Sequence, residues 1–108
     1  NPNGSLGTYK LMHDFGVNRG IDGMCLDADG NIIATAGWKR GGPGPMIYVF
    51  APTGDVLETH PVPVDRPTNC TFGGSELQTL YVTSIDGHLL KAVTNRKGRT
   101  LYPASVCE

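Results

Sequence analysis

A single carboxylate, Asp22, lies at the head of a predicted strand in the segment Ile21-Asp22-Gly23-Met24-Cys25-Leu26. A carboxylate in this position can ligate a hard cation or act as a general base toward water. An aspartate that only accepts backbone N–H hydrogen bonds at the start of a strand gives the same local sequence. The residue type alone therefore leaves a catalytic, a metal-binding and a purely structural interpretation open.

The Asp22 segment has a counterpart later in the chain. A second strand start, at Thr68-Asn69-Cys70-Thr71-Phe72, follows after 46 residues (68 minus 22). Turns that end in glycine, at 1–4, 51–54 and more weakly at 95–98, recur in phase with it. A period of roughly 40 to 50 residues is typical of β-propeller blades, each a four-stranded sheet. Thr68 is therefore the equivalent, in the second unit, of Asp22 in the first. Thr68 and Asn69 are candidates to contact a ligand. The alternative is that their side chains only form hydrogen bonds with backbone groups at the start of the strand.

Short apolar runs separated by Gly, Pro and Asp turns predict the strands that position these residues, and helix-period patterns are absent. The fold class is therefore all-β, a β-propeller of which the chain holds about two blades and one leading strand. We expect a partial propeller over 1–108: an outer strand of a preceding blade at 5–15, a first blade at 21–62 and a second at 67–103. The predicted strands cover 6–12, 22–26, 31–36, 46–50, 56–60, 69–72, 79–83, 88–93 and 99–101.

A glycine-rich and proline-rich segment, 37–45, is expected to form a long loop at the same end of the blade as Asp22. Trp38, Lys39 and Arg40 lie in it and would overlook the mouth of the central channel. Trp38 and Arg40 are therefore candidate substrate-binding residues. An exposed loop without a role in binding has the same composition.

Charge and hydropathy limit the partners. Nine basic and ten acidic residues give a formal net charge of -1, which offers no electrostatic footprint for nucleic acid or for an anionic membrane surface. No apolar run approaches the ~18 residues that a membrane-spanning helix requires. Nucleic acid and a membrane are therefore not expected as partners.

Three cysteines, Cys25, Cys70 and Cys107, lie far apart in the sequence, and none forms a CxxC pair. That spacing disfavours a zinc site, and thiols in inner strands are expected to be buried apolar side chains. Free thiols favour a reducing compartment such as the cytoplasm; a periplasmic or secreted location is the alternative if an N-terminal signal is missing.

Two blades cannot close on themselves, because each blade is stabilised by neighbours on both faces. We therefore expect the chain to pack against missing propeller blades or against other copies of itself. Three two-blade chains could in principle close a ring of six blades.

The segments 21–31, 49–54 and 61–74, followed by Thr79-Leu80-Tyr81-Val82-Thr83, occur here in an ordered combination. This combination resembles the C-terminal part of the gluconolactonase / regucalcin (senescence marker protein) family. The resemblance covers about Gly4 to Leu101. The ordered set of segments is specific evidence for the family, whereas each segment alone is weak evidence.

The resemblance implies a six-bladed propeller that holds one divalent metal, usually Ca²⁺ and sometimes Zn²⁺ or Mn²⁺, and hydrolyses a sugar lactone. It makes Asp22 both the metal ligand and the base that activates water. The family's other ligands, a glutamate and asparagines, have no counterpart in this chain. A non-catalytic ligand-binding or scaffold propeller is the alternative, since a fold does not by itself fix an activity.

Overall fold

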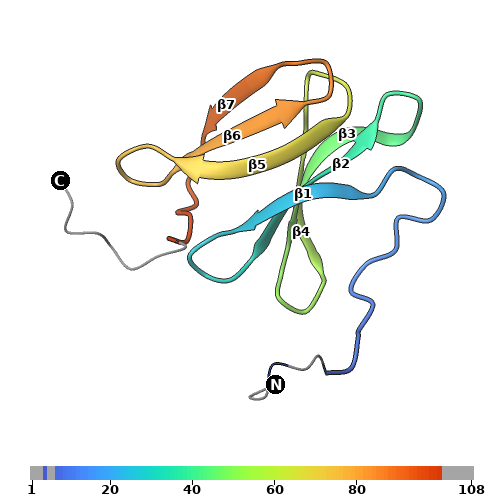
Figure 1. Ribbon diagram of the computed structural model, residues 1–108, viewed down its shortest axis with the longest axis horizontal. Coiled ribbons are helices and arrows are strands. Elements are labelled where there is room, and N and C mark those ends of the chain that lie inside the picture. The colour runs from blue at the N-terminus through green and yellow to red at the C-terminus, as the bar shows by residue number, and fades with distance from the viewer. Residues whose placement is uncertain (1–3, 5–6, 101–108) are drawn as a thin grey trace.

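The computed structural model of the chain describes residue 4 and residues 7–100. These residues form two antiparallel β-sheets and contain no helix, which confirms the all-β prediction (Figure 1). The strands are β1 (Ile21–Leu26), β2 (Ile32–Trp38), β3 (Gly41–Phe50), β4 (Val56–Pro61), β5 (Pro67–Gly73), β6 (Thr79–Ser84) and β7 (Leu89–Val93). Within the described part, no helix exists that could cross a membrane.

The first sheet has the order β1-β2-β3-β4 and the second the order β5-β6-β7. Within each sheet, every strand pairs with the next one along the chain, which is the meander of a propeller blade. The turn between β1 and β2 is fixed by Asp27, whose Oδ1 accepts hydrogen bonds from the backbone N–H groups of Asp29 and Asn31, each at 2.9 Å. Gly30 completes this turn with a φ of 84°, a conformation that glycine adopts without steric cost.

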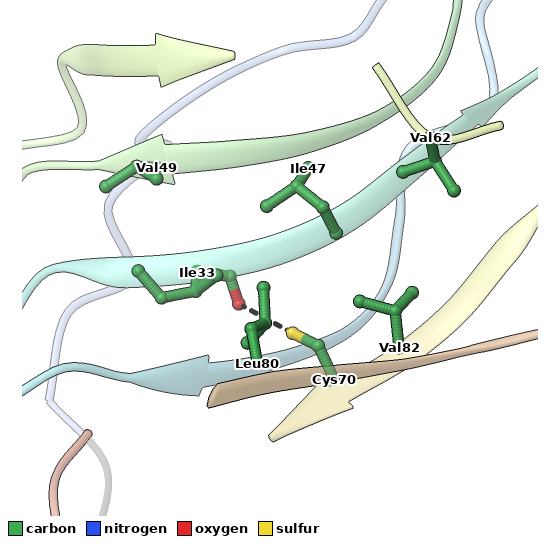
Figure 2. Packing of buried hydrophobic residues seen from close by; sticks show 7 residues of the cluster. All are labelled: Ile33, Ile47, Val49, Val62, Cys70, Leu80 and Val82. Carbon is green, nitrogen blue, oxygen red and sulfur yellow. Dashed lines mark hydrogen bonds between the residues drawn. The ribbon is translucent and has the colours of Figure 1, made fainter. Parts of the chain in front are cut away.

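The main core lies between the two sheets. Figure 2 shows apolar side chains of β2 and β3 facing those of β5 and β6. The cluster consists of Ile33, Ile47, Val49, Val62, Cys70, Leu80 and Val82. A sheet covered on both faces carries continuous apolar runs instead of alternating ones, which explains why residues 33–37 of β2 are all buried.

The opposite face of the first sheet is covered by the N-terminal segment. Phe15 packs edge-on against Tyr48, with ring centroids 5.2 Å apart. The ring centroids of His13 and Phe50 are also 5.2 Å apart. Residues 7–15, the described part of the outer strand predicted at 5–15, form no strand with the two sheets of this chain. That strand would pair within a preceding blade, so its assignment stays a prediction. Here the aromatic contacts of His13 and Phe15 hold the segment across the face of the first sheet.

The long loop predicted at 37–45 is also wrong. β2 continues to Trp38, β3 begins at Gly41, and the two are joined by a turn at Lys39 and Arg40. The register shifts between Ala36 and Trp38, where Gly37 has a φ of 83°. A Cβ added at Gly37 would lie 2.0 Å from the Gly44 carbonyl oxygen. The glycines therefore allow the two strands to continue through this segment as an irregular hairpin. Their abundance in the sequence predicts a loop instead.

The segment after β7 returns to the first sheet. Gly98 forms an antiparallel bridge with Asp27, and the Arg99 N–H donates to the Leu26 carbonyl at 3.3 Å. The predicted strand at 99–101 is not formed by Arg99 or Thr100, and Leu101 lies outside the described residues. These contacts tie the far ends of the two sheets together, on the side opposite Asp22.

Candidate functional site

Asp22 lies in a distorted part of β1. The pairing of β1 with β2 changes register between Ile21 and Met24, so Asp22 and Gly23 are displaced from the regular ladder. Such irregularities in a strand redirect side chains and are common beside active sites. The Asp22 side chain is 50 % exposed and is therefore accessible to a ligand.

Thr35 replaces the missing ladder contacts at this distortion. Its hydroxyl donates to the Gly23 carbonyl at 3.0 Å and accepts from the Gly23 N–H at 3.1 Å. Thr35 is fully buried, and a buried backbone group without a partner costs free energy. The hydroxyl thus holds in place the backbone next to Asp22.

We predict that Thr35→Val lowers the free energy of unfolding by about 2 kcal/mol, because both Gly23 backbone groups lose their partner. Thr35→Ser keeps the hydroxyl and loses only a methyl group, at a cost of about 1 kcal/mol. Urea denaturation followed by circular dichroism measures both. A valine variant as stable as the serine variant would show that burial, and not the hydrogen bonds, determines this position.

Arg19 is a site residue that sequence reasoning missed. Its Nη2 donates to Asp22 Oδ2 at 3.0 Å, while its Nη1 donates to the carbonyls of Gly37 at 2.9 Å and Pro67 at 3.1 Å. One guanidinium therefore connects Asp22 to the end of β2 and to the start of β5. The only signal in the sequence is an arginine three residues before an aspartate, which is too common to be informative.

The start of β5 lies beside Asp22, as the repeat predicted. A Cβ added at Gly23 would lie 2.3 Å from Asn69 Oδ1 and 2.6 Å from the Thr68 carbonyl oxygen, so only glycine allows β1 and β5 to approach this closely. The Thr68 hydroxyl is 2.9 Å from the Thr83 hydroxyl, and Asn69 Oδ1 accepts from the Cys70 N–H at 2.8 Å. Both side chains have partners within the protein, and a ligand role for them stays a prediction.

Trp38 and Arg40 contact each other at the tip of the β2–β3 hairpin. The Arg40 guanidinium carbon lies 5.6 Å from the centroid of the Trp38 ring, which is a cation–π arrangement. The Lys39 N–H donates to Asp65 Oδ1 at 2.8 Å, which fastens this tip to the segment before β5. The turn end of the hairpin is linked to Asp22 through Arg19, which donates to both the Gly37 carbonyl and Asp22 Oδ2, while a substrate contact of Trp38 or Arg40 stays a prediction.

A cavity of about 530 Å³ lies elsewhere, between the two sheets, and most of its lining comes from β3, β4, β6, β7 and the segments that follow β4 and β7. Its walls are mostly apolar, and neither Asp22 nor Thr68 lines it. It contains none of the residues predicted for catalysis, so the candidate site is the exposed rim formed by Asp22, Arg19 and the start of β5.

Asp22 fits a hard cation as one ligand among several. Its carboxylate is exposed, and one oxygen is oriented by Arg19. Among the described residues, no group of three or more His, Cys, Asp or Glu side chains could hold a metal ion. Ca²⁺ takes six to eight oxygen ligands, so this part of the chain can supply only a portion of such a site.

Two successive antiparallel sheets that pack face to face, each a meander of neighbouring strands, are the arrangement of adjacent β-propeller blades. A sequence model of the SMP-30/gluconolactonase/LRE-like region matches residues 1–86. The chain therefore belongs to the SMP-30/gluconolactonase/LRE-like family, as the resemblance indicated.

Several characterised proteins are similar to this chain. Regucalcin of Xenopus laevis is 38 % identical over 76 residues, which cover 70 % of this chain and 23 % of that protein. Human regucalcin is 40 % identical over 76 residues, with 69 % and 23 % covered. The 6-deoxy-6-sulfogluconolactonase of Pseudomonas putida is 36 % identical over 83 residues, with 75 % and 27 % covered. The chain thus spans about a quarter of the length of the curated relatives it matches.

Proposed function

We propose that this chain supplies two blades of a propeller that uses a divalent cation, most favourably Ca²⁺, to hydrolyse a sugar lactone. In this proposal Asp22 ligates the cation and acts as the general base. The observation that supports this most strongly is the exposed Asp22 carboxylate, held at the head of β1 by Arg19 and beside the head of β5. Membership of the family and the similarity to a sulfogluconolactonase supply the reaction class.

The residues of this chain have separable roles in the proposal. Arg19 holds Asp22 Oδ2, which leaves Oδ1 to face the ligand and to take the proton of an attacking water. Thr35 fixes the Gly23 backbone, so that the carboxylate keeps one direction. When bound, the cation would polarise the lactone carbonyl and stabilise the negative charge that develops on its oxygen.

The remaining ligands must come from other blades, because one carboxylate binds Ca²⁺ weakly. Large apolar side chains that lie open in the structure agree with this. Leu89 and Val93 of β7 are 69 % and 84 % exposed, although blades normally bury such side chains against a neighbour. Further blades, or other copies of the chain, are the partners we propose for these surfaces.

The test uses a grafted propeller, in which residues 1–86 replace the matching segment of the Pseudomonas putida enzyme. That scaffold supplies the other blades, and its own activity on 6-deoxy-6-sulfogluconolactone is the positive control. We expect calorimetry to show one bound Ca²⁺ per grafted propeller. Asp22→Asn, which removes a charged oxygen ligand, should weaken this binding at least about tenfold. Asp29→Asn, an exposed aspartate at the far end of β1, is the matched control and should leave binding unchanged.

A folded graft whose calcium affinity is unchanged by the Asp22→Asn substitution would refute the assignment of Asp22 as a ligand. A graft that binds the lactone and Ca²⁺ but does not turn over would favour the non-catalytic binding propeller instead. Circular dichroism and gel filtration establish folding before either comparison is made.

A further inference from the structure

Two thiols meet where the two sheets come together. Cys25 belongs to β1 and Cys70 to β5, and their Sγ atoms are 3.8 Å apart. Both cysteines are free. Figure 2 shows the Cys70 sulfur directed into the interface, toward the Ile33 carbonyl, which it contacts at 3.4 Å.

We propose that Cys25 and Cys70 form a reversible redox pair, which a low-molecular-weight disulfide such as glutathione disulfide oxidises to an intramolecular disulfide linking the two sheets. This proposal does not depend on the lactonase activity, because neither sulfur contacts Asp22. Its ligand is a small thiol or disulfide, and its product is a covalent link between neighbouring blades.

The backbone geometry places both cysteines within reach of each other. Two residues before each of them, at Gly23 and Thr68, β1 and β5 converge so closely that a Cβ on Gly23 would lie 2.6 Å from the Thr68 carbonyl oxygen. A disulfide requires a sulfur–sulfur distance of about 2.05 Å and Cα atoms within about 7 Å. Rotation of the two side chains, with a small approach of the strands, closes the remaining separation.

The two sulfurs differ in accessibility. Both cysteines line a pocket of about 510 Å³, together with Asn69 and Arg99, but Cys25 is only half-buried whereas Cys70 is 6 % exposed. A small disulfide that enters this pocket therefore reaches Cys25 first. The positive charge of Arg99 favours the approach of an anionic reagent such as glutathione disulfide.

The pKa values of the two thiols differ in the direction that also favours Cys25 as the reactive residue. The hydrogen bond with Cys70 lowers the pKa of Cys25, although burial opposes this. The same hydrogen bond, reinforced by burial, raises the pKa of Cys70. Since the thiolate is the nucleophile in thiol–disulfide exchange, Cys25 is the attacking residue and Cys70 the resolving one.

The reaction proceeds in two balanced steps. The Cys25 thiolate attacks one sulfur of glutathione disulfide, forms a mixed disulfide and releases one glutathione thiolate, which takes up a proton. Cys70 then loses its proton and attacks Cys25 Sγ, which releases the second glutathione. Together the two cysteine thiols lose two electrons and two protons, and glutathione disulfide gains them to become two molecules of glutathione.

The experiment uses the whole chain with Cys107→Ser, which removes the third thiol. After incubation with glutathione disulfide under native conditions, mass spectrometry should show the loss of two hydrogens and a peptide linking Cys25 to Cys70. When Cys70→Ala is added, the reaction should stop at Cys25 with one glutathionyl group attached. When Cys25→Ala is added instead, Cys70 should remain a free thiol.

The oxidised chain should also melt at a temperature higher by at least about 5 °C than the reduced chain, because the link constrains the unfolded state. Dithiothreitol should restore both thiols and the lower melting temperature. Glutathione on both cysteines without a cross-link would overturn the proposal, as would faster labelling of Cys70 than of Cys25. These readouts need no lactone, so they are independent of the outcome for Asp22.

Discussion

Asp27→Ala should lower the free energy of unfolding by about 3 kcal/mol, because the variant removes a buried carboxylate together with its hydrogen bonds and its ion pair with Arg96. The Asp27 side chain is 1 % exposed. It accepts hydrogen bonds from the Asp29 and Asn31 N–H groups, from Asn31 Nδ2 at 3.0 Å and from Arg96 Nη1 at 3.1 Å. Its removal leaves the Asp29 and Asn31 N–H groups without their side-chain acceptor and takes from Arg96 one of its two carboxylate partners, the other being Glu58.

The matched control is Asp29→Ala, two residues away in the same turn. Asp29 is exposed, so this variant should change stability by less than about 0.5 kcal/mol. Urea denaturation of the two variants beside the wild type gives both values. A loss below about 1 kcal/mol for Asp27→Ala would mean that the hydrogen bonds and the ion pair of Asp27 do not stabilise this end of the structure.

The same carboxylate should make stability depend on pH in acid. Burial alone would raise the pKa of Asp27, but hydrogen bonds from Asn31, Asp29 and Arg96 outweigh it and hold the pKa below its ordinary value. A lowered pKa in the folded state means that the contribution is complete above the unfolded value of about 3.9 and is lost as the pH falls through the folded value. The stability difference between the wild type and Asp27→Ala should therefore shrink below about pH 4.

Much of the fold could be predicted because local patterns dictated it. The strands predicted at 22–26, 56–60 and 79–83 correspond to β1, β4 and β6 within one residue. Alternation and turn chemistry act over a few residues, and a blade is a meander of neighbouring strands. The 46-residue spacing (68 minus 22) also predicted, correctly, that Thr68 and Asp22 begin neighbouring strands.

What sequence reasoning missed has two physical causes: contacts between distant parts of the chain, and glycine backbone conformations that composition does not reveal. Residues 7–15 cross the face of the first sheet because Phe15 packs against Tyr48 there, and no local sequence pattern indicates that contact. The segment 37–45 forms a hairpin because positive-φ glycines absorb the register shift, whereas composition alone indicates a loop. Arg19 was missed because its partners, the carbonyls of Gly37 and Pro67, are backbone groups that are distant in sequence.

The candidate site could be predicted only in part from the residues themselves. Asp22 stood out by its position, but its interpretation as a ligand depended on the family resemblance, because strand-start aspartates are common. The structure adds the supports of that carboxylate, Arg19 and Thr35, which the sequence did not single out. Thr68 and Asn69 lie beside Gly23 as expected, with their side chains bonded within the protein.

The loss of Asp22 should affect activity far more than stability. Asp22 is half exposed, so Asp22→Asn removes little packing, yet in the proposal it removes both a cation ligand and the base. Loss of a general base alone typically costs about 10²- to 10⁴-fold in rate. We therefore expect kcat/KM to fall by about 10³-fold in the grafted propeller, with an unfolding midpoint close to that of the wild type.

The most direct test is lactone hydrolysis by the grafted propeller, followed at saturating Ca²⁺ for the wild type, Asp22→Asn and Asp29→Asn. The account predicts that the Asp29 variant stays within about twofold of the wild type, while the Asp22 variant falls by about 10³-fold. An Asp22→Asn propeller that keeps more than about a tenth of the wild-type kcat/KM would contradict the claim that this chain carries a catalytic carboxylate.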